Sequence, residues 1–214
     1  MYTDADAPLI DALWSTVAAH GWRGVTPGRL AAASGLPARE IVERFPNRLD
    51  LLRLHAEAVE QAVAAGTVPN QGGTPRDRLF DVLMRGVDAL QPHRAGMLRV
   101  MREMRGDPVL ALAYAPVLRW SMARMLDAAE LDSAGAAGAA RATGLIGVWL
   151  ATLRAWEGDE GQDLGPTMAA LDRALDRAEQ LARSLGIRPG DLALPADDAL
   201  PPEAPPAAPP PPMP

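Results

Sequence analysis

Residues 9–54 read LIDALWSTVAAHGWRGVTPGRLAAASGLPAREIVERFPNRLDLLRL, and this stretch decides the fold. Apolar residues recur in it every three or four positions, and start and stop signals divide it into helices. We expect these helices over residues 8–21, 27–34, 38–44 and 48–65. Three short helices, two of them joined by a tight turn, run into a longer fourth, which is the layout of a helix-turn-helix module.

Capping residues place the boundaries of these helices. Thr26 stands directly before Pro27, a combination that favours a helix start, and Gly35 favours a helix end. Asn47 precedes the fourth helix, and Asp50 occupies the reciprocal position of a capping box. The caps and the apolar periodicity agree, so the sequence predicts a small three-helix core that holds the third helix at its surface.

The composition favours helices throughout the chain of 214 residues. Hydrophobic residues make up 48% but aromatic residues only 4%, which suits close-packed helices better than sheets, and we predict an all-α fold. The absence of cysteine excludes disulfides, thiolate metal sites and cysteine nucleophiles. His20, His55 and His93 fall in separate predicted helices with no pair at ligand spacing, so we expect no metal site and no cofactor.

Further helices are predicted after residue 65. Pro75, Pro92 and Pro108 mark helix starts, two of them behind a capping residue, Thr74 or Asp107. We expect helices over residues 75–90, 92–105, 108 onward past a kink at Pro116, 136–156 and 166–185. Residues 188–214 combine proline runs with few large apolar groups, which predicts a disordered tail.

No apolar run approaches the roughly 20 residues of a membrane-spanning helix. The N-terminal MYTDADAP is acidic and lacks the basic and apolar regions of a signal peptide. We therefore expect a soluble, cytoplasmic protein.

The stretch 9–54 resembles the N-terminal domain of the TetR family of bacterial transcriptional regulators. The matching positions are Gly21-Trp22, Thr26, Leu30-Ala31, Gly35-Leu36, Phe45-Pro46-Asn47-Arg48 and Leu51-Leu52. The resemblance implies a helix-turn-helix domain over 8–54, followed by a helical ligand-binding and dimerisation domain over 55–187. It also implies a regulator that binds double-stranded operator DNA as a homodimer and responds to a small apolar ligand.

The resemblance assigns DNA contacts to the start of the second helix, to the third or recognition helix, and to the start of the fourth. The residues at these positions are Thr26, Ala38, Arg39, Glu40, Val42, Glu43, Arg44 and Arg48. Several depart from the family pattern, since Ala38 replaces a common lysine, Glu40 a common threonine and Val42 the expected tyrosine. Residues 1–65 hold six arginines and eight acidic residues, so this domain has no positive excess for phosphate contacts.

The C-terminal half also resembles the ubiquinone-biosynthesis accessory proteins, which have a TetR-like fold and bind lipid without catalysis. The likeness lies in residues 76–104, 120–122 and 148–175. This second resemblance implies an alternative function, in which the protein is a lipid-binding accessory protein with a degenerate helix-turn-helix. Nine arginines against five acidic residues between 76 and 124 would suit peripheral contact with an anionic lipid surface.

Methionines at helical spacing suggest an adaptable apolar pocket among the middle helices, although core packing explains them as well. The pocket candidates are Met84, Met97, Met101, Met104, Trp120 and Met122. The last two helices carry regular apolar seams, and in TetR-like proteins the corresponding pair forms the dimer interface. The interface candidates are Leu145, Trp149, Leu153, Leu171 and Leu175, with packing inside the monomer as the alternative.

Catalysis is not expected. Asp159, Glu160 and Asp163 cluster in a glycine-rich connection, but no base, nucleophile or metal partner is spaced to act with them. Capping of a helix or solvation in a loop accounts for these acids.

Overall fold

The computed structural model describes residues 2–68 and 72–184, and every regular element in these ranges is a helix. The α-helices are α1 (Ala7–His20), α2 (Pro27–Ser34), α3 (Ala38–Arg44), α4 (Arg48–Gly66), α5 (Pro75–Leu90), α6 (Arg94–Gly106), α7 (Pro108–Ala128), α8 (Gly135–Glu157) and α9 (Gly165–Ser184). The prediction of an all-α fold is confirmed. The tail predicted over 188–214 lies outside the described residues.

The predicted caps are present. Thr26 Oγ1 accepts a hydrogen bond from the Arg29 N–H (3.4 Å), and Gly35 ends α2 with φ of 75°. The Asn47 side chain accepts from the Leu49 N–H (3.0 Å), while Asp50 accepts from the Asn47 N–H (2.9 Å). Local chemistry therefore sets the ends of α2 and the start of α4.

One predicted helix start is wrong. We expected the helix after α5 to begin at Pro92, but Gln91–His93 form a 3-10 turn and α6 begins at Arg94. The reason is local, since His93 has φ of −109° and ψ of 15° and leaves the α-helical conformation. The turn separates α5 from α6.

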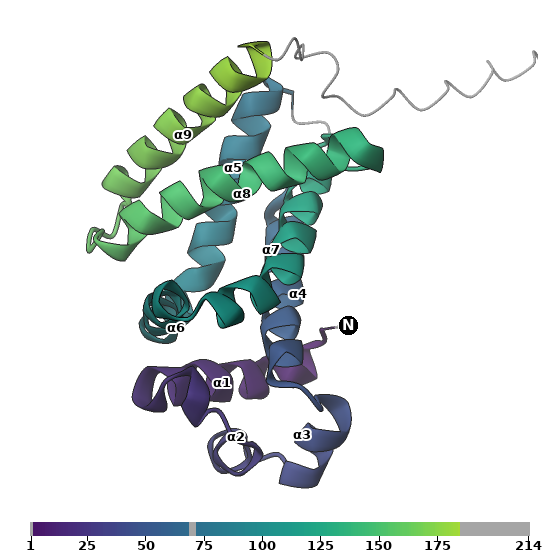
Figure 1. The fold of residues 1–214 in the computed structure, drawn as a ribbon, viewed down its shortest axis with the longest axis vertical. Coiled ribbons are helices and arrows are strands. Elements are labelled where there is room, and N and C mark those ends of the chain that lie inside the picture. The colour runs from purple at the N-terminus through teal and green to yellow at the C-terminus, as the bar shows by residue number, and fades with distance from the viewer. Residues whose placement is uncertain (1, 69–71, 185–214) are drawn as a thin grey trace, which may run out of the picture.

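The helices α1–α3 form a head at one end of the molecule, and α5–α9 form a body (Figure 1). The long helix α4 runs from the head into the body, where α8 and α9 lie side by side at the far end (Figure 1). The axis of α7, which contains Pro116, changes direction along its length (Figure 1). Buried apolar side chains form a single continuous core through head and body.

Helices α1 and α6 join head and body in a constant register. Asp11 Oδ1 lies 2.9 Å from His93 Nε2, and the two residues are 82 positions apart. Further along, Arg99 Nη1 donates to the Ala18 carbonyl oxygen (2.9 Å), across a separation of 81 positions. Because the residue numbers rise together, the two helices run parallel, and the head is attached along the length of α1.

Helix α8 corrects the expectation that no segment could span a membrane. It has 23 residues, and a window within it has a mean hydropathy of 1.3, so its length and composition alone would allow a crossing. Alanine supplies a large share of this hydropathy, and a search for runs of large apolar residues does not detect it. In the structure 39% of the window is buried inside the protein.

Candidate nucleic-acid interface

Helices α2 and α3 lie at the tip of the head, at the end of the molecule away from α8 and α9 (Figure 1). Leu30 of α2 and Ile41 of α3 are each 2% exposed and attach the two helices to the head core. The outer surface of α3 presents Ala38, Arg39, Val42 and Glu43, all exposed. This is the arrangement that a recognition helix requires, with an anchored inner side and a free outer side.

The other predicted DNA contacts flank this surface. Thr26 is exposed at the start of α2, and Arg48 is exposed at the start of α4. The Arg48 guanidinium donates to the Trp22 carbonyl oxygen (3.2 Å) and lies 5.8 Å from the centre of the Trp22 ring. Trp22 is 5% exposed, so Arg48 covers the head core with part of its side chain.

Arg44 is paired with a buried carboxylate that sequence reasoning missed. Asp6 is 1% exposed and accepts hydrogen bonds from the Arg44 guanidinium, from the Thr3 N–H (2.9 Å) and from the Thr3 hydroxyl (2.9 Å). Burial alone would raise the pKa of Asp6, but the hydrogen bonds from Arg44 and Thr3 outweigh it and hold the pKa below its ordinary value. The N-terminal turn Asp4–Asp6 therefore fixes the C-terminal end of α3.

The remaining charges on α3 also pair within the helix. Arg39 Nε lies 2.7 Å from Glu43 Oε1, and Arg44 Nη1 lies 3.6 Å from Glu40 Oε1. The first pair is well exposed, at 88% and 61% of the two side chains, so it contributes little to stability. Its effect is on charge, because α3 holds two arginines and two glutamates and is neutral overall.

We expect Asp6→Ala to lower the free energy of unfolding by about 2 kcal/mol, because a hydrogen bond to a charged group contributes about 1.5–3 kcal/mol. Arg44 has a side chain that is 40% exposed and regains water, which keeps the loss moderate. Urea unfolding measures the change, and hydrogen exchange should be faster in α3. The matched control is Asp4→Ala, an exposed acid of the same turn, and equal losses in both variants would contradict this role of Asp6.

The six pocket candidates lie in or beside the core of the body. Met97 and Met122 are buried, at 9% and 0% exposure, while Met84, Met101 and Met104 are partly buried against the core. Trp120 is partly buried, and the Arg53 guanidinium lies 5.8 Å from its ring centre. Their place in a ligand pocket stays a prediction.

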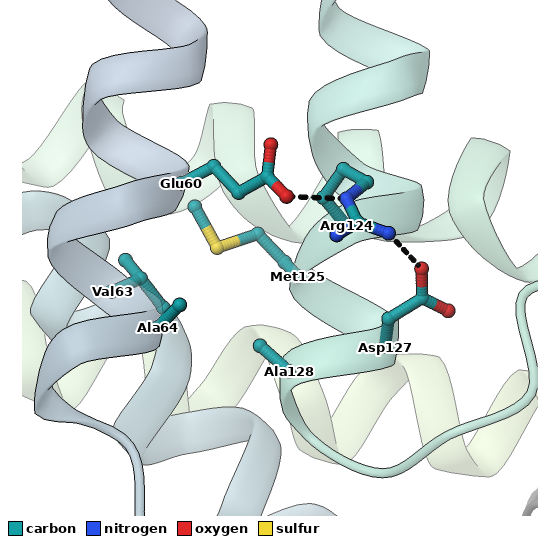
Figure 2. A pocket seen from close by; sticks show the side chains of 7 residues that line it. All are labelled: Glu60, Val63, Ala64, Arg124, Met125, Asp127 and Ala128. Carbon is teal, nitrogen blue, oxygen red and sulfur yellow. Dashed lines mark hydrogen bonds and ion pairs between the residues drawn. The ribbon is translucent and has the colours of Figure 1, made fainter. Parts of the chain in front are cut away.

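Two hollows lie on the body, and none of the six pocket candidates lines either of them. The first, about 210 Å³, lies between α4 and α7 and is lined by Glu60, Val63, Ala64, Arg124, Met125, Asp127 and Ala128. Figure 2 shows Arg124 between Glu60 and Asp127, with the Asp127 contact at 2.9 Å. The second, about 180 Å³, is lined mainly by polar residues near the start of α5, among them Asp77, Arg78 and Asp81. Both are smaller than the roughly 300 Å³ at which ligand pockets usually begin.

The sequence matches no protein-family model and no curated protein. Its fold, in contrast, matches solved structures. A TetR transcriptional regulator from Nitrosomonas europaea superposes with a TM-score of 0.61 at 18% identity, over 83% of this chain and 99% of that one. A TetR transcriptional regulator from Rhodococcus sp. RHA1 gives 0.59 at 15% identity, over 81% and 94%. The chain has the TetR fold.

Within this TetR fold, the five interface candidates are buried in the single chain, and their place in a dimer interface stays a prediction. Leu145, Trp149, Leu153, Leu171 and Leu175 are between 0% and 6% exposed in the single chain. They pack inside the protein, where α8 meets α9, and leave almost no surface for a partner. The apolar seam marks the sides of α8 and α9 that face the chain's own core.

The arginine excess of residues 76–124 is largely offset inside the TetR fold. Five of its nine arginines pair with carboxylates: Arg76 with Asp172 and Asp176, Arg78 with Glu130, Arg99 with Glu103, Arg105 with Glu157, and Arg124 with Glu60. Three of these pairs join different helices of the body, α5 to α9, α6 to α8 and α7 to α4. The excess therefore serves packing more than a basic surface.

Two histidines that the sequence separates are neighbours at the joint of head and body. The rings of His55 (α4) and His93 have centroids 5.5 Å apart, and the Trp14 ring lies 4.8 Å from that of His55. Both ring nitrogens of His55 are buried without a hydrogen-bond partner. Burial, followed by the nearby charge of His93, lowers the pKa of His55 to about 3. Across the described ranges, no group of three or more potential ligands is placed to hold a metal ion.

The acidic cluster of the α8–α9 connection has a structural role. Asp159 accepts hydrogen bonds from the Thr167 N–H (3.0 Å) and hydroxyl (2.6 Å), while Asp163 accepts from the Gly165 N–H (3.4 Å). These bonds satisfy donors in the first turn of α9, as acidic residues commonly do at helix starts.

Proposed function

We propose that this protein is a transcriptional regulator of the TetR type, acting in the cytoplasm on double-stranded operator DNA. The main support is the exposed outer face of α3, which the buried Leu30 and Ile41 hold at the tip of the head. The fold that this chain shares with the two TetR transcriptional regulators supports the same function. A repressor role follows the commonest use of such a helix-turn-helix, in which the bound protein covers the operator.

We place a homodimer contact on the outer face of α8. That face presents a stripe of small or apolar exposed residues, formed by Ala136, Ala140, Thr143, Gly144, Gly147, Leu150 and Ala151. Leu150 is 52% exposed, and a Cβ added at Gly144 or Gly147 would meet nothing within 4 Å. Small residues let two helices approach closely, so this stripe can pack against its own copy across a two-fold axis. Two heads in a fixed relation would then engage two half-sites.

Ligand response would pass through α6. A small apolar ligand beside Met97, Met101 and Met104 would shift α6, and the parallel contacts with α1 would carry that shift to the head. Operator affinity falls when the ligand binds better to the arrangement in which the two heads no longer match the half-sites.

A gel-shift assay tests the proposal on the DNA upstream of the protein's own gene, at low and at moderate salt. We expect a specific shift that weakens as salt rises, because phosphate contacts release counterions. Ala38→Glu places a charge on the outer face of α3 and should weaken binding at least tenfold. Ala111→Glu makes the same change at an exposed position of α7 and should leave binding unchanged.

The alternative predicts a different result. In that case no specific shift would be seen, and mass spectrometry would identify an isoprenoid that co-purifies with the protein. Those two results would favour a lipid-binding accessory protein over a transcriptional regulator.

A further inference from the structure

The outer face of α3 offers no unpaired guanidinium. Arg39 is paired with Glu43 at 2.7 Å, and Arg44 is held by the buried Asp6. Arginine recognises guanine by donating two hydrogen bonds from one guanidinium fork. If Arg39 left this ion pair to contact a base, the negative charge of Glu43 would lie unpaired near the DNA phosphates and be repelled by them. This face is therefore poorly suited to guanine.

Apolar groups occupy the centre of the same face. Ala38 and Val42 are four positions apart, so their side chains lie on one side of the helix. Both are exposed, and Val42 keeps 48% of its surface accessible although it follows the fully anchored Ile41. The core does not need this side chain, and its branched form does not favour the helix. A contact outside the chain would account for it.

The major groove presents one apolar group on its base edges, the C5 methyl of thymine. We infer that α3 recognises thymine in each operator half-site by packing Ala38 and Val42 against C5 methyl groups. The inference rests on the proposed DNA binding and names the base chemistry that this surface selects. Glu43 stays paired with Arg39, so the face approaches the groove without net charge.

The experiment begins with selection of duplexes from a random pool by the full-length protein, which supplies a tight-binding site. Each thymine of that site is then replaced by deoxyuridine, which removes only the methyl group. We expect one or two positions per half-site at which this change weakens binding about fourfold, since burial of one methyl contributes about 0.8 kcal/mol. Replacement elsewhere in the site should have no effect.

Variants assign the contact to Val42. Val42→Ala removes the contact from both half-sites of the proposed homodimer and should weaken binding to the thymine site about fifteenfold. Replacement by deoxyuridine of the thymine that Val42 contacts should then have no further effect on the variant. Val109→Ala is the matched control, because Val109 is 76% exposed on α7, away from α3. Circular dichroism establishes that the variants fold alike.

The outcomes separate the two proposals. If selection enriches no sequence, DNA recognition and the thymine inference both fail. If a site is enriched but no deoxyuridine replacement weakens binding, the thymine inference fails and the proposed regulator function stands. The same holds if Val42→Ala loses as much affinity for the deoxyuridine site as for the thymine site. An enriched site with cytosine at the positions protected by α3 would also overturn it, because Glu43 would then be the contacting residue.

Discussion

Lowering the pH from about 6.5 to about 4.5 should reduce the free energy of unfolding by about 2–3 kcal/mol through His55 alone, at roughly 1.4 kcal/mol per pH unit. The pKa of His55 falls from 6.5 to about 3 in the folded protein, because its ring is buried beside His93. Above pH 6.5 the ring is neutral in both states and the stability is complete. As the pH falls from 6.5 toward 3, His55 binds a proton in the unfolded chain but stays neutral in the folded protein, so the unfolded state is favoured.

The variant His55→Phe isolates this contribution. Phenylalanine keeps an aromatic ring against Trp14 and removes the two unpaired nitrogens, so the variant should be at least as stable as the natural protein at pH 7. Urea unfolding at several pH values measures both proteins, and their difference should widen steadily in acid. Parallel pH profiles would show that His55 is not the group responsible, since carboxylates affect both proteins equally.

Gly96→Ala should lower the free energy of unfolding by about 2 kcal/mol, within the usual range of about 1–3 kcal/mol for overpacking. A Cβ at Gly96 would lie 2.5 Å from the Trp14 carbonyl oxygen, and backbone cannot move aside as a flexible side chain can. The clash would push α6 away from α1. Urea unfolding gives the loss of stability, and hydrogen exchange should locate it in α1 and α6.

Gly106→Ala provides the control on the same helix. A Cβ there meets nothing within 4 Å, so the change should be neutral or stabilise by a few tenths of a kcal/mol, since alanine favours helix. Should the two alanine variants behave alike, the close approach of α1 and α6 at Gly96 would not limit the fold.

The parts of the fold that sequence predicted well depend on neighbours within a few residues. Thr26, Gly35 and Asn47 act on backbone groups no more than four positions away, so their meaning is visible in a short stretch. The two ends of α2 and the start of α4 follow directly from them. The 3-10 turn before α6 escaped prediction because a proline at a helix start also fits a turn.

Contacts between distant segments were beyond such reasoning. Asp6 and Arg44 are 38 positions apart, and the Thr3-Asp6 spacing was the one local signal that could have marked Asp6 as a capping residue. His55 and His93 meet only because α1, α4 and the turn before α6 converge.

What the apolar seams of α8 and α9 pack against was hard to predict for a related reason. Periodicity shows that Trp149 and Leu171 share a side with other apolar residues, but does not reveal whether that side meets the same chain or another. Apart from Leu150, the exposed stripe of α8 consists of residues too small to stand out in the sequence as an apolar face.

The parallel register of α1 and α6 limits how this head can be exchanged in engineered regulators. A chimera joined at α4 would replace Trp22 and Ala18 but retain Arg99 and Glu103, which bond to their backbone groups. The new head would need a first helix whose backbone packs closely against Gly96. It would also need a free backbone N–H opposite Glu103. The unit that can be transplanted is therefore the head together with α6, although the two are separated by most of α4 and all of α5.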